Sequence, residues 1–136
     1  MWSEGQDLAS WVDRWADHQP DAPAIEFEGS ATSFKALSLR VSSVADWLNA
    51  QDINVGDRVA WLGPNRPLAI ELLLACSRLG AIFLPLNSRL LVSEHQWIID
   101  NAEPAPSAKR SENSVADSKC IICLLYTSDA ADDSLR

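Results

Sequence analysis

Three cysteines are the first residues whose type and spacing could do chemistry. Cys120 and Cys123 are separated by two residues, which is the spacing of redox and zinc-binding pairs. One pair supplies only two of four zinc ligands, no βαβ pattern follows it, and Cys76 lies in an apolar helical stretch. We therefore predict reduced thiols and no metal site.

Two polar strings are candidates for contact with a ligand. Asp57 and Arg58 could bind one another or a ligand, but a turn before a buried strand favours solvated charges. Gly63-Pro64-Asn65-Arg66 follows that strand at its carboxyl end, where ligand crevices of α/β folds form. A strand-to-helix turn, with Asn65 or Pro67 starting the next helix, explains the same residues.

Neither histidine has a nucleophile and an acid nearby in the sequence. His18 is placed at the end of one predicted helix, where an imidazole suits the helix dipole, and His95 in the first turn of another. We assign no catalytic, cofactor-binding or metal-binding residue to this chain.

The elements that position these residues follow from apolar periodicity. A helix with Leu8, Trp11, Val12 and Trp15 on one face starts at the cap Asp7. A half-exposed strand at 24–28 turns back at Gly29-Ser30 into 31–33. A second helix, capped by Ser33, carries Leu37, Val41, Val44, Ala45 and Leu48.

The next segment predicts a βαβ unit. A strand at 59–62, buried on both faces, is followed by a helix at 68–79 that Gly80 closes, and then by a second buried strand at 81–84, which Pro85-Leu86-Asn87 ends. Ser93 and Gln96 predict a capping box for a last helix, ended by Asn101 and Pro104. The fold class is α/β with a parallel βαβ unit.

Composition excludes several functions. The net charge of −8, with 11 dispersed basic residues, argues against nucleic acid. The apolar span 72–86 is too short and broken for a transmembrane helix, and the first residues contain no secretory signal. We expect a cytoplasmic protein.

After Pro104 the apolar period disappears, and we place a domain boundary there. Residues 1–104 form the first unit, and we expect 105–136 to be an unstructured or spurious tail. The string from Cys123 to Asp133 resembles translated sequencing-adapter read-through.

Several strings in order resemble the N-terminal part of the adenylate-forming (AMP-binding) superfamily, especially its acyl-CoA synthetases. The resemblance covers roughly Leu8 to Pro104, with Glu94 in its last part. It is carried by Pro20-Asp21-Ala22-Pro23-Ala24, by Thr32 to Leu37, by Val55 to Ala60, by Pro64-Asn65, and by Leu79 to Leu90, which includes Asn87 and Arg89. The resemblance implies an enzyme that joins a carboxylic or fatty acid to ATP and then to CoA, with Mg²⁺ at the phosphates.

The residues that would do this chemistry are missing. The family needs a glycine-rich Ser/Thr loop, an acidic residue for the ribose and a C-terminal Lys. Tyr126-Thr127-Ser128 looks like the start of that loop, but Asp129-Ala130-Ala131-Asp132-Asp133 follows instead of glycines. These three carboxylates would repel a polyphosphate, and without glycines the backbone loses the freedom that the loop requires. In the part of the chain that carries the resemblance, we expect Asn87 and Arg89 to fix a loop and not to take part in catalysis.

Two hypotheses follow. The first is that the chain is the N-terminal fragment of an ATP-dependent acyl-CoA synthetase of fatty acid metabolism. Under this hypothesis the fragment is inactive alone and binds no cofactor. It can self-associate through apolar core residues that the missing part would cover. The alternative is a small α/β protein-interaction module without catalysis. A cut synthetase should aggregate through its uncovered apolar face, whereas a module should be monodisperse.

Overall fold

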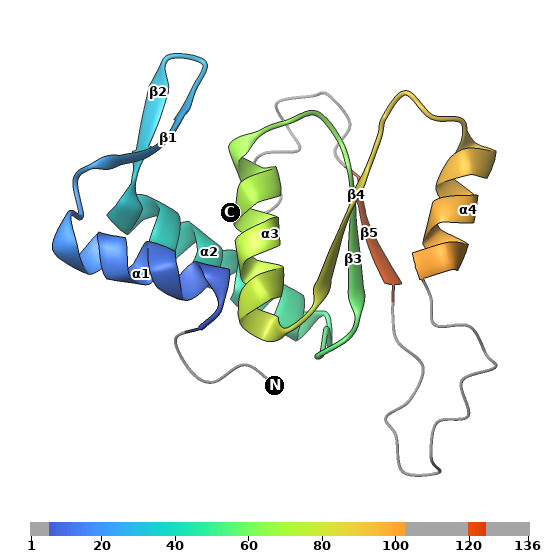
Figure 1. Ribbon diagram of the computed structural model, residues 1–136, viewed down its shortest axis with the longest axis horizontal. Helices are drawn as coiled ribbons and strands as arrows, with labels where there is room; N and C mark the ends of the chain where they lie inside the picture. Colours follow the sequence, from blue (N-terminus) through green and yellow to red (C-terminus); the bar gives the residue numbers. More distant parts are fainter. Residues whose placement is uncertain (1–5, 103–119, 125–136) are drawn as a thin grey trace, which may run out of the picture.

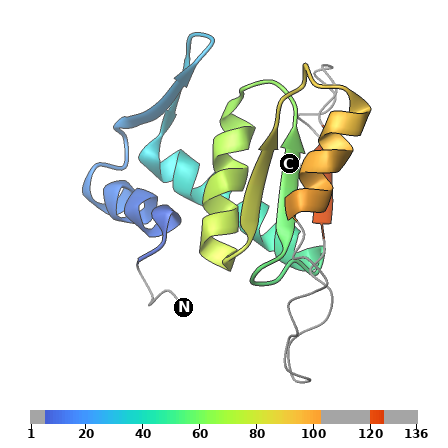
Figure 2. The ribbon, with the colours of Figure 1, turned by 45° about the vertical axis from the view of Figure 1, so that its right-hand side comes forward.

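Three helices lie on one side of a small parallel sheet, and a fourth lies on the other side (Figures 1 and 2). The computed structural model describes residues 6–102 and the backbone of residues 120–124. The elements in chain order are α1 (Leu8–His18), β1 (Pro23–Phe27), β2 (Ser30–Ser33), α2 (Phe34–Ala50), β3 (Arg58–Leu62), α3 (Pro67–Leu79), β4 (Ile82–Leu86), α4 (Val92–Ala102) and β5 (Cys120–Leu124).

The first two helices begin at the predicted caps. The Asp7 carboxylate accepts a hydrogen bond from the Ser10 amide at 3.0 Å, and the Ser33 hydroxyl accepts one from the Ala36 amide at 3.1 Å. The apolar stripe predicted for α2 is buried in full. Both helix predictions are therefore confirmed.

The β1–β2 hairpin projects away from the helices (Figure 1). Its turn is formed by Glu28 and Gly29, which both have positive φ, rather than by the predicted Gly29-Ser30. Two successive residues of positive φ match the twist of the strands they join. Ser30 is therefore free to begin β2, where it pairs with Phe27.

The predicted βαβ unit is confirmed as β3, α3 and β4, with the two strands parallel and in register from Arg58↔Ile82 to Leu62↔Leu86. Gly80 closes α3 in the left-handed conformation, at φ 70°. β5 pairs with the other side of β3, also in parallel. Five residues of the segment 105–136 thus extend along the sheet.

The prediction that the second strand is buried was wrong. Ile82 is 46% exposed, Pro85 is exposed, and only Leu86 of β4 is buried. Among the described strands, β4 lies at the end of the order β4-β3-β5 and has a partner on one side only, whereas β3 lies between two strands. No residue of α4 is buried, so that helix does not cover β4 closely. The strand also runs through Pro85 and Leu86, which were expected to end it.

Asp57 and Arg58 are buried, which corrects the expectation that they are solvated. They are 6% and 7% exposed. The Asp57 carboxylate accepts a hydrogen bond from the Asn54 amide at 2.7 Å, and its carbonyl oxygen accepts one from the Ile82 amide at 2.7 Å. Arg58 begins the central strand. The turn is thus packed against the amino end of the sheet.

The capping box predicted for the last helix was also wrong. α4 begins at Val92, before Ser93, and the Glu94 carboxylate accepts a hydrogen bond from the Leu91 amide at 2.7 Å. Gln96 instead donates to Asp100 at 2.8 Å. Glu94 is therefore the acidic residue that satisfies the first turn.

Polar side chains join the three helices on the α3 side of the sheet. Arg78 of α3 donates to Ser42 of α2 at 2.9 Å and to Asp13 of α1 at 2.7 Å. Ser38 of α2 donates to the other oxygen of Asp13 at 2.6 Å. This network fixes α1 and α2 against the helix of the βαβ unit.

Candidate functional site

The candidate site is the edge of the sheet at which β3, β4 and β5 end. The three strands are parallel, so their carboxyl ends meet at that edge. α3 leads from β3 to β4 on one side, while β5 lies on the other side of β3. The connection therefore changes direction between β3 and β5, which is where ligands bind in open α/β sheets.

The loop after β3 is a tight strand-to-helix connection. Pro67 is the first residue of α3, as one reading predicted, and Asn65 is not. Arg66 occupies the N-cap position in extended conformation without a side-chain cap, and its carbonyl oxygen accepts a hydrogen bond from the Ala69 amide at 2.9 Å. The amino end of α3 thus faces the carboxyl edge of the sheet, with its partial positive charge.

The loop after β4 is held by Asn87. Its side-chain oxygen accepts from the Arg89 amide at 2.9 Å, and its carbonyl oxygen accepts from the Leu90 amide at 3.1 Å. The Nε2 atom of His95 lies 2.6 Å from the same carbonyl oxygen. Asn87 and His95 therefore connect the end of β4 to α4, which is the loop-fixing role expected of Asn87.

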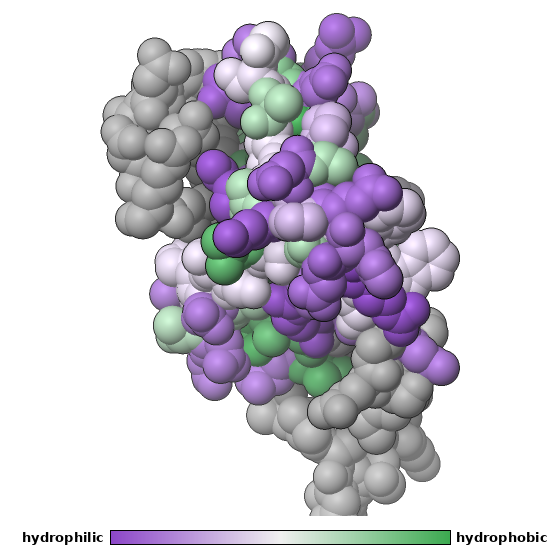
Figure 3. Space-filling view, turned by 90° about the vertical axis from the view of Figure 1, so that its left-hand side faces the viewer, coloured by the Kyte–Doolittle hydropathy of each residue, from purple (hydrophilic) through white to green (hydrophobic). Residues whose placement is uncertain are grey.

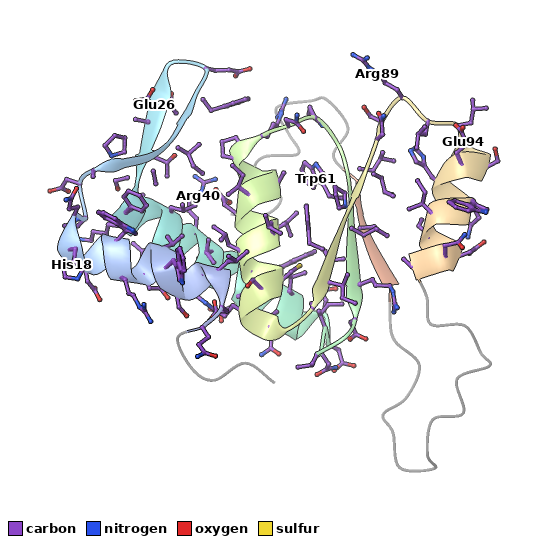
Figure 4. The ribbon with its side chains drawn as sticks, viewed as in Figure 1. His18, Glu26, Arg40, Trp61, Arg89 and Glu94 are labelled. Atoms are coloured by element: carbon purple, nitrogen blue, oxygen red, sulfur yellow. The ribbon has the colours of Figure 1, made fainter. Side chains whose placement is uncertain are left out.

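Two arginine side chains lie on these loops. Arg89 is exposed on the loop after β4, near Glu94 at the start of α4 (Figure 4), and Arg66 precedes α3. Among the described residues the salt bridges recorded involve other arginines, Arg40 with Glu71 and Arg78 with Asp13. In a chain of net charge −8, this edge offers guanidinium groups to an anion. The sequence alone did not mark Arg66 as a cation of the site, although its place after a buried strand was the available signal.

The remaining sequence candidates do not converge on this edge. His18 lies at the far end of α1, near the hairpin that carries Glu26 (Figure 4). Cys76 is buried in α3. Cys120 and Cys123 lie in β5, and their side chains are outside the described part, as are Tyr126-Thr127-Ser128 and the three carboxylates that follow.

Clustered metal ligands and clustered glycines are the two features that would mark a site for Mg²⁺ and nucleotide phosphates. Within 6–102, no group of three or more His, Cys, Asp or Glu side chains could hold a metal ion. The five glycines of the whole sequence, at positions 5, 29, 56, 63 and 80, do not cluster into a loop that presents successive amides.

The chain resembles known proteins over most of its length. The sequence model of the AMP-binding enzyme family matches residues 12–129. A feruloyl-CoA synthase of Amycolatopsis sp. is 47% identical over 89 residues, which cover 65% of this chain and 18% of that protein. An indoleacetate–CoA ligase of Aromatoleum aromaticum is 37% identical over 99 residues, which cover 73% of this chain and 19% of that protein.

The fold has solved counterparts as well. The NpsA N-terminal subdomain of Klebsiella oxytoca, in complex with 3-hydroxyanthranilyl-AMSN, superposes with a TM-score of 0.67 at 23% identity, over 71% of this chain and 25% of that one. The chain therefore spans about a fifth of the length of the curated relatives it matches. It belongs to the AMP-binding (adenylate-forming) enzyme family and corresponds to the N-terminal part of that family's CoA ligases.

Proposed function

We propose that this chain is the N-terminal scaffold of an ATP-dependent acyl-CoA synthetase. The parent enzyme would join a carboxylic acid to ATP as an acyl-adenylate with release of pyrophosphate, and would then transfer the acyl group to CoA. The observation that carries the proposal is the parallel β3-α3-β4 unit, whose carboxyl edge has the amino end of α3 and the loops with Arg66 and Arg89 beside it. The relatives named as CoA ligases support the same reaction class.

The role of this part would be to hold strands and loops, and we infer that the chain is inactive alone. The described residues offer no group suited to a metal ion, and the sequence after β5 places Asp129, Asp132 and Asp133 where the family's glycines would stand. Carboxylates at that position repel phosphate. ATP, Mg²⁺ and CoA would therefore be ligands of the parent enzyme, bound largely by its other parts.

The compartment and the domain limits belong to the proposal too. Among the described residues no helix is long and apolar enough to cross a membrane. We propose a cytoplasmic parent enzyme whose sequence follows this chain to about Pro104, with 105–136 as a foreign or rearranged tail. The family match does not favour the alternative of a stand-alone interaction module.

The gene downstream of the Pro104 codon tests this proposal. We expect independent sequencing to give a continuous frame that runs into a glycine-rich Ser/Thr loop, and the protein made from it to release pyrophosphate from ATP when a carboxylic acid is added. A gene that reproduces Ser128-Asp129 and stops after Arg136 would contradict the proposed relation to a complete synthetase.

A further inference from the structure

Arg58, the first residue of the central strand β3, carries a buried positive charge. The residue is 7% exposed. Its Nε and Nη1 atoms are buried and have no hydrogen-bond partner in the part of the chain that the structure describes. The salt bridges recorded there belong to Arg40 and Arg78. A buried cation without a counter-charge is costly, and the described residues leave this cost uncompensated.

The Arg58 side chain projects from the face of the sheet on which α4 lies. Side chains alternate between the two faces along a strand. Val59 and Trp61 belong to the core that β3 shares with α2 and α3, whereas Ala60 is buried but lies outside that core. Arg58 alternates with Val59 and shares the face of Ala60. It therefore lies on the opposite face from α3.

The described elements cover this second face incompletely. α4 is the helix that lies on it (Figure 2), and none of the residues of α4 is buried. Parallel sheets are normally covered on both faces. Because the chain spans about a fifth of the length of the curated relatives it matches, the larger part of a complete synthetase remains to supply that cover.

The place of Arg58 along β3 argues against a substrate phosphate as its counter-ion. Arg58 is at the amino end of the strand and Leu62 is at the carboxyl end, four residues further on, which corresponds to about 13 Å. Ligands of open α/β sheets bind at the carboxyl edge. The counter-charge that fits the amino end is therefore a carboxylate of protein packed on the α4 face, which a guanidinium binds by charge-assisted hydrogen bonds.

We propose that Arg58 binds a carboxylate side chain from the part of the parent enzyme that follows this chain, where that part packs on the α4 face of the sheet. The inference rests on the proposed function, since its partner is the rest of an acyl-CoA synthetase. In the complete enzyme the pair neutralises the buried charge and joins the amino end of β3 to the added part. In the isolated chain the charge stays uncompensated.

The isolated 136-residue chain tests the unpaired charge. Arg58→Met keeps much of the apolar stem and removes the charge, so we expect its urea unfolding midpoint to rise by roughly 0.5 M. Arg58→Lys keeps a charge and should show no such rise. A lower midpoint in Arg58→Met would show that the guanidinium already has a counter-charge within the chain, and would overturn the proposal.

Arg78→Met is the matched control for this measurement. Arg78 donates to Ser42 at 2.9 Å and to Asp13 at 2.7 Å, so its guanidinium is paired within the chain. We expect the same substitution to lower the urea midpoint there. The opposite signs at Arg58 and Arg78 would separate loss of an unpaired charge from the general effect of replacing arginine by methionine.

The protein made from the complete gene tests the partner. There the effect should reverse: Arg58→Met should unfold at a lower urea concentration than the parent protein, because it leaves a carboxylate buried without its cation. Arg58→Lys should lie between the two. A complete protein that Arg58→Met stabilises would overturn the proposal. Urea midpoints report on the ion pair and pyrophosphate release reports on the reaction, so failure of the pair and failure of the synthetase function are distinguishable.

Discussion

At the scale of single residues, the ion pair between Arg40 and Glu71 joins a partly exposed side chain to a buried one. The Arg40 Nε atom lies 2.6 Å from the Glu71 Oε1 atom, and the two side chains are 43% and 3% exposed. Figure 4 shows Arg40 beside α3. The pair joins α2 to the amino half of α3, the helix that follows the candidate site.

This difference in exposure predicts that removing Arg40 and removing Glu71 lower the free energy of unfolding by different amounts. Arg40→Ala leaves a buried carboxylate without its cation, and we expect it to lower the free energy of unfolding by about 3 kcal/mol. Glu71→Gln leaves a guanidinium that water can reach, and we expect a loss of about 1 kcal/mol. Urea unfolding of both variants measures the difference; equal costs, or a larger cost for Glu71→Gln, would show that burial does not govern this pair.

Asp7 predicts a pH dependence at the start of α1. Burial raises the pKa of its carboxyl, but hydrogen bonds from the Ser10 hydroxyl and amide lower the pKa by more than burial raises it. The net pKa therefore lies below the usual value. A pKa lowered by folding stabilises the folded chain in full above the unfolded value of about 3.9, and this contribution is lost as the pH falls through the folded pKa.

Asp7→Asn keeps a cap acceptor and removes the charge, so it isolates this effect. We expect the variant to be less stable than the parent chain at pH 7 and the gap to shrink below about pH 4. Asp7→Ala, which also removes the cap, should cost about 1 kcal/mol at neutral pH. Urea unfolding midpoints of the parent chain and of Asp7→Asn across this pH range give the comparison. A stability difference between the two that does not change with pH would contradict a lowered pKa of Asp7.

At the scale of elements, Gly80 controls the angle at which α3 passes into β4. Its φ is 70°, and a Cβ atom added there would lie 3.2 Å from the Val55 Cγ2 atom. Gly29 also has positive φ, 78°, but a Cβ atom there would meet nothing within 4 Å. Left-handed backbone is costly for any residue with a Cβ, and at Gly80 steric contact adds to that cost.

We therefore expect Gly80→Ala to lower the free energy of unfolding by about 2 kcal/mol and Gly29→Ala by about 1 kcal/mol. Val55→Ala removes the contacting methyl groups, so Gly80→Ala should cost less in that background. Chemical denaturation of the single and double variants measures the coupling, and purely additive effects would show that Val55 plays no part.

The helices were predictable from the sequence because each has a local signal. Asp7 and Ser33 accept hydrogen bonds from residues three positions on, and the α2 stripe repeats at helical spacing. Gly80 closes α3 as predicted. The place of the candidate site followed from the βαβ order, because parallel strands fix where their carboxyl ends lie.

The errors concern features that long-range packing decides. The apolar sequence of β4 does not show that this strand is the outermost one of the described sheet, and Asp57 and Arg58 are buried because β3 is central in it. The partners Arg40–Glu71 and Arg78–Asp13 are 31 and 65 residues apart, and no local pattern connects them. Glu94 replaced Ser93 and Gln96 at the start of α4 because the helix begins earlier than its sequence suggested.

At the scale of the whole molecule, exposed large apolar side chains lie at both ends of the described chain; on α1, Leu8, Trp11 and Trp15 are 53%, 63% and 48% exposed. The side formed by α1 and the hairpin is largely hydrophilic, with scattered apolar residues (Figure 3). On α4 and the loop before it, Leu91, Val92 and Trp97 are 70%, 84% and 67% exposed. If the rest of a synthetase normally covers α4, this surface is uncovered in the isolated chain.

We therefore expect the 136-residue chain to self-associate as its concentration rises. Sedimentation velocity should show a growing weight-average mass, and Val92→Ser combined with Trp97→Ser should reduce the association. Leu39→Ser, at a residue of α2 that is 62% exposed, is the control that should leave it unchanged. A monodisperse monomer that melts cooperatively would instead favour an independent interaction module.

We propose that the chain carries the scaffold of an adenylate-forming CoA ligase without its catalytic machinery. An assay for pyrophosphate release tests this: the purified 136-residue chain is supplied with ATP, Mg²⁺, CoA and a mixture of fatty and aromatic acids, with a complete feruloyl-CoA synthase as the positive control. We predict no release above the enzyme-free blank. Acid-dependent release above that blank would contradict the claim.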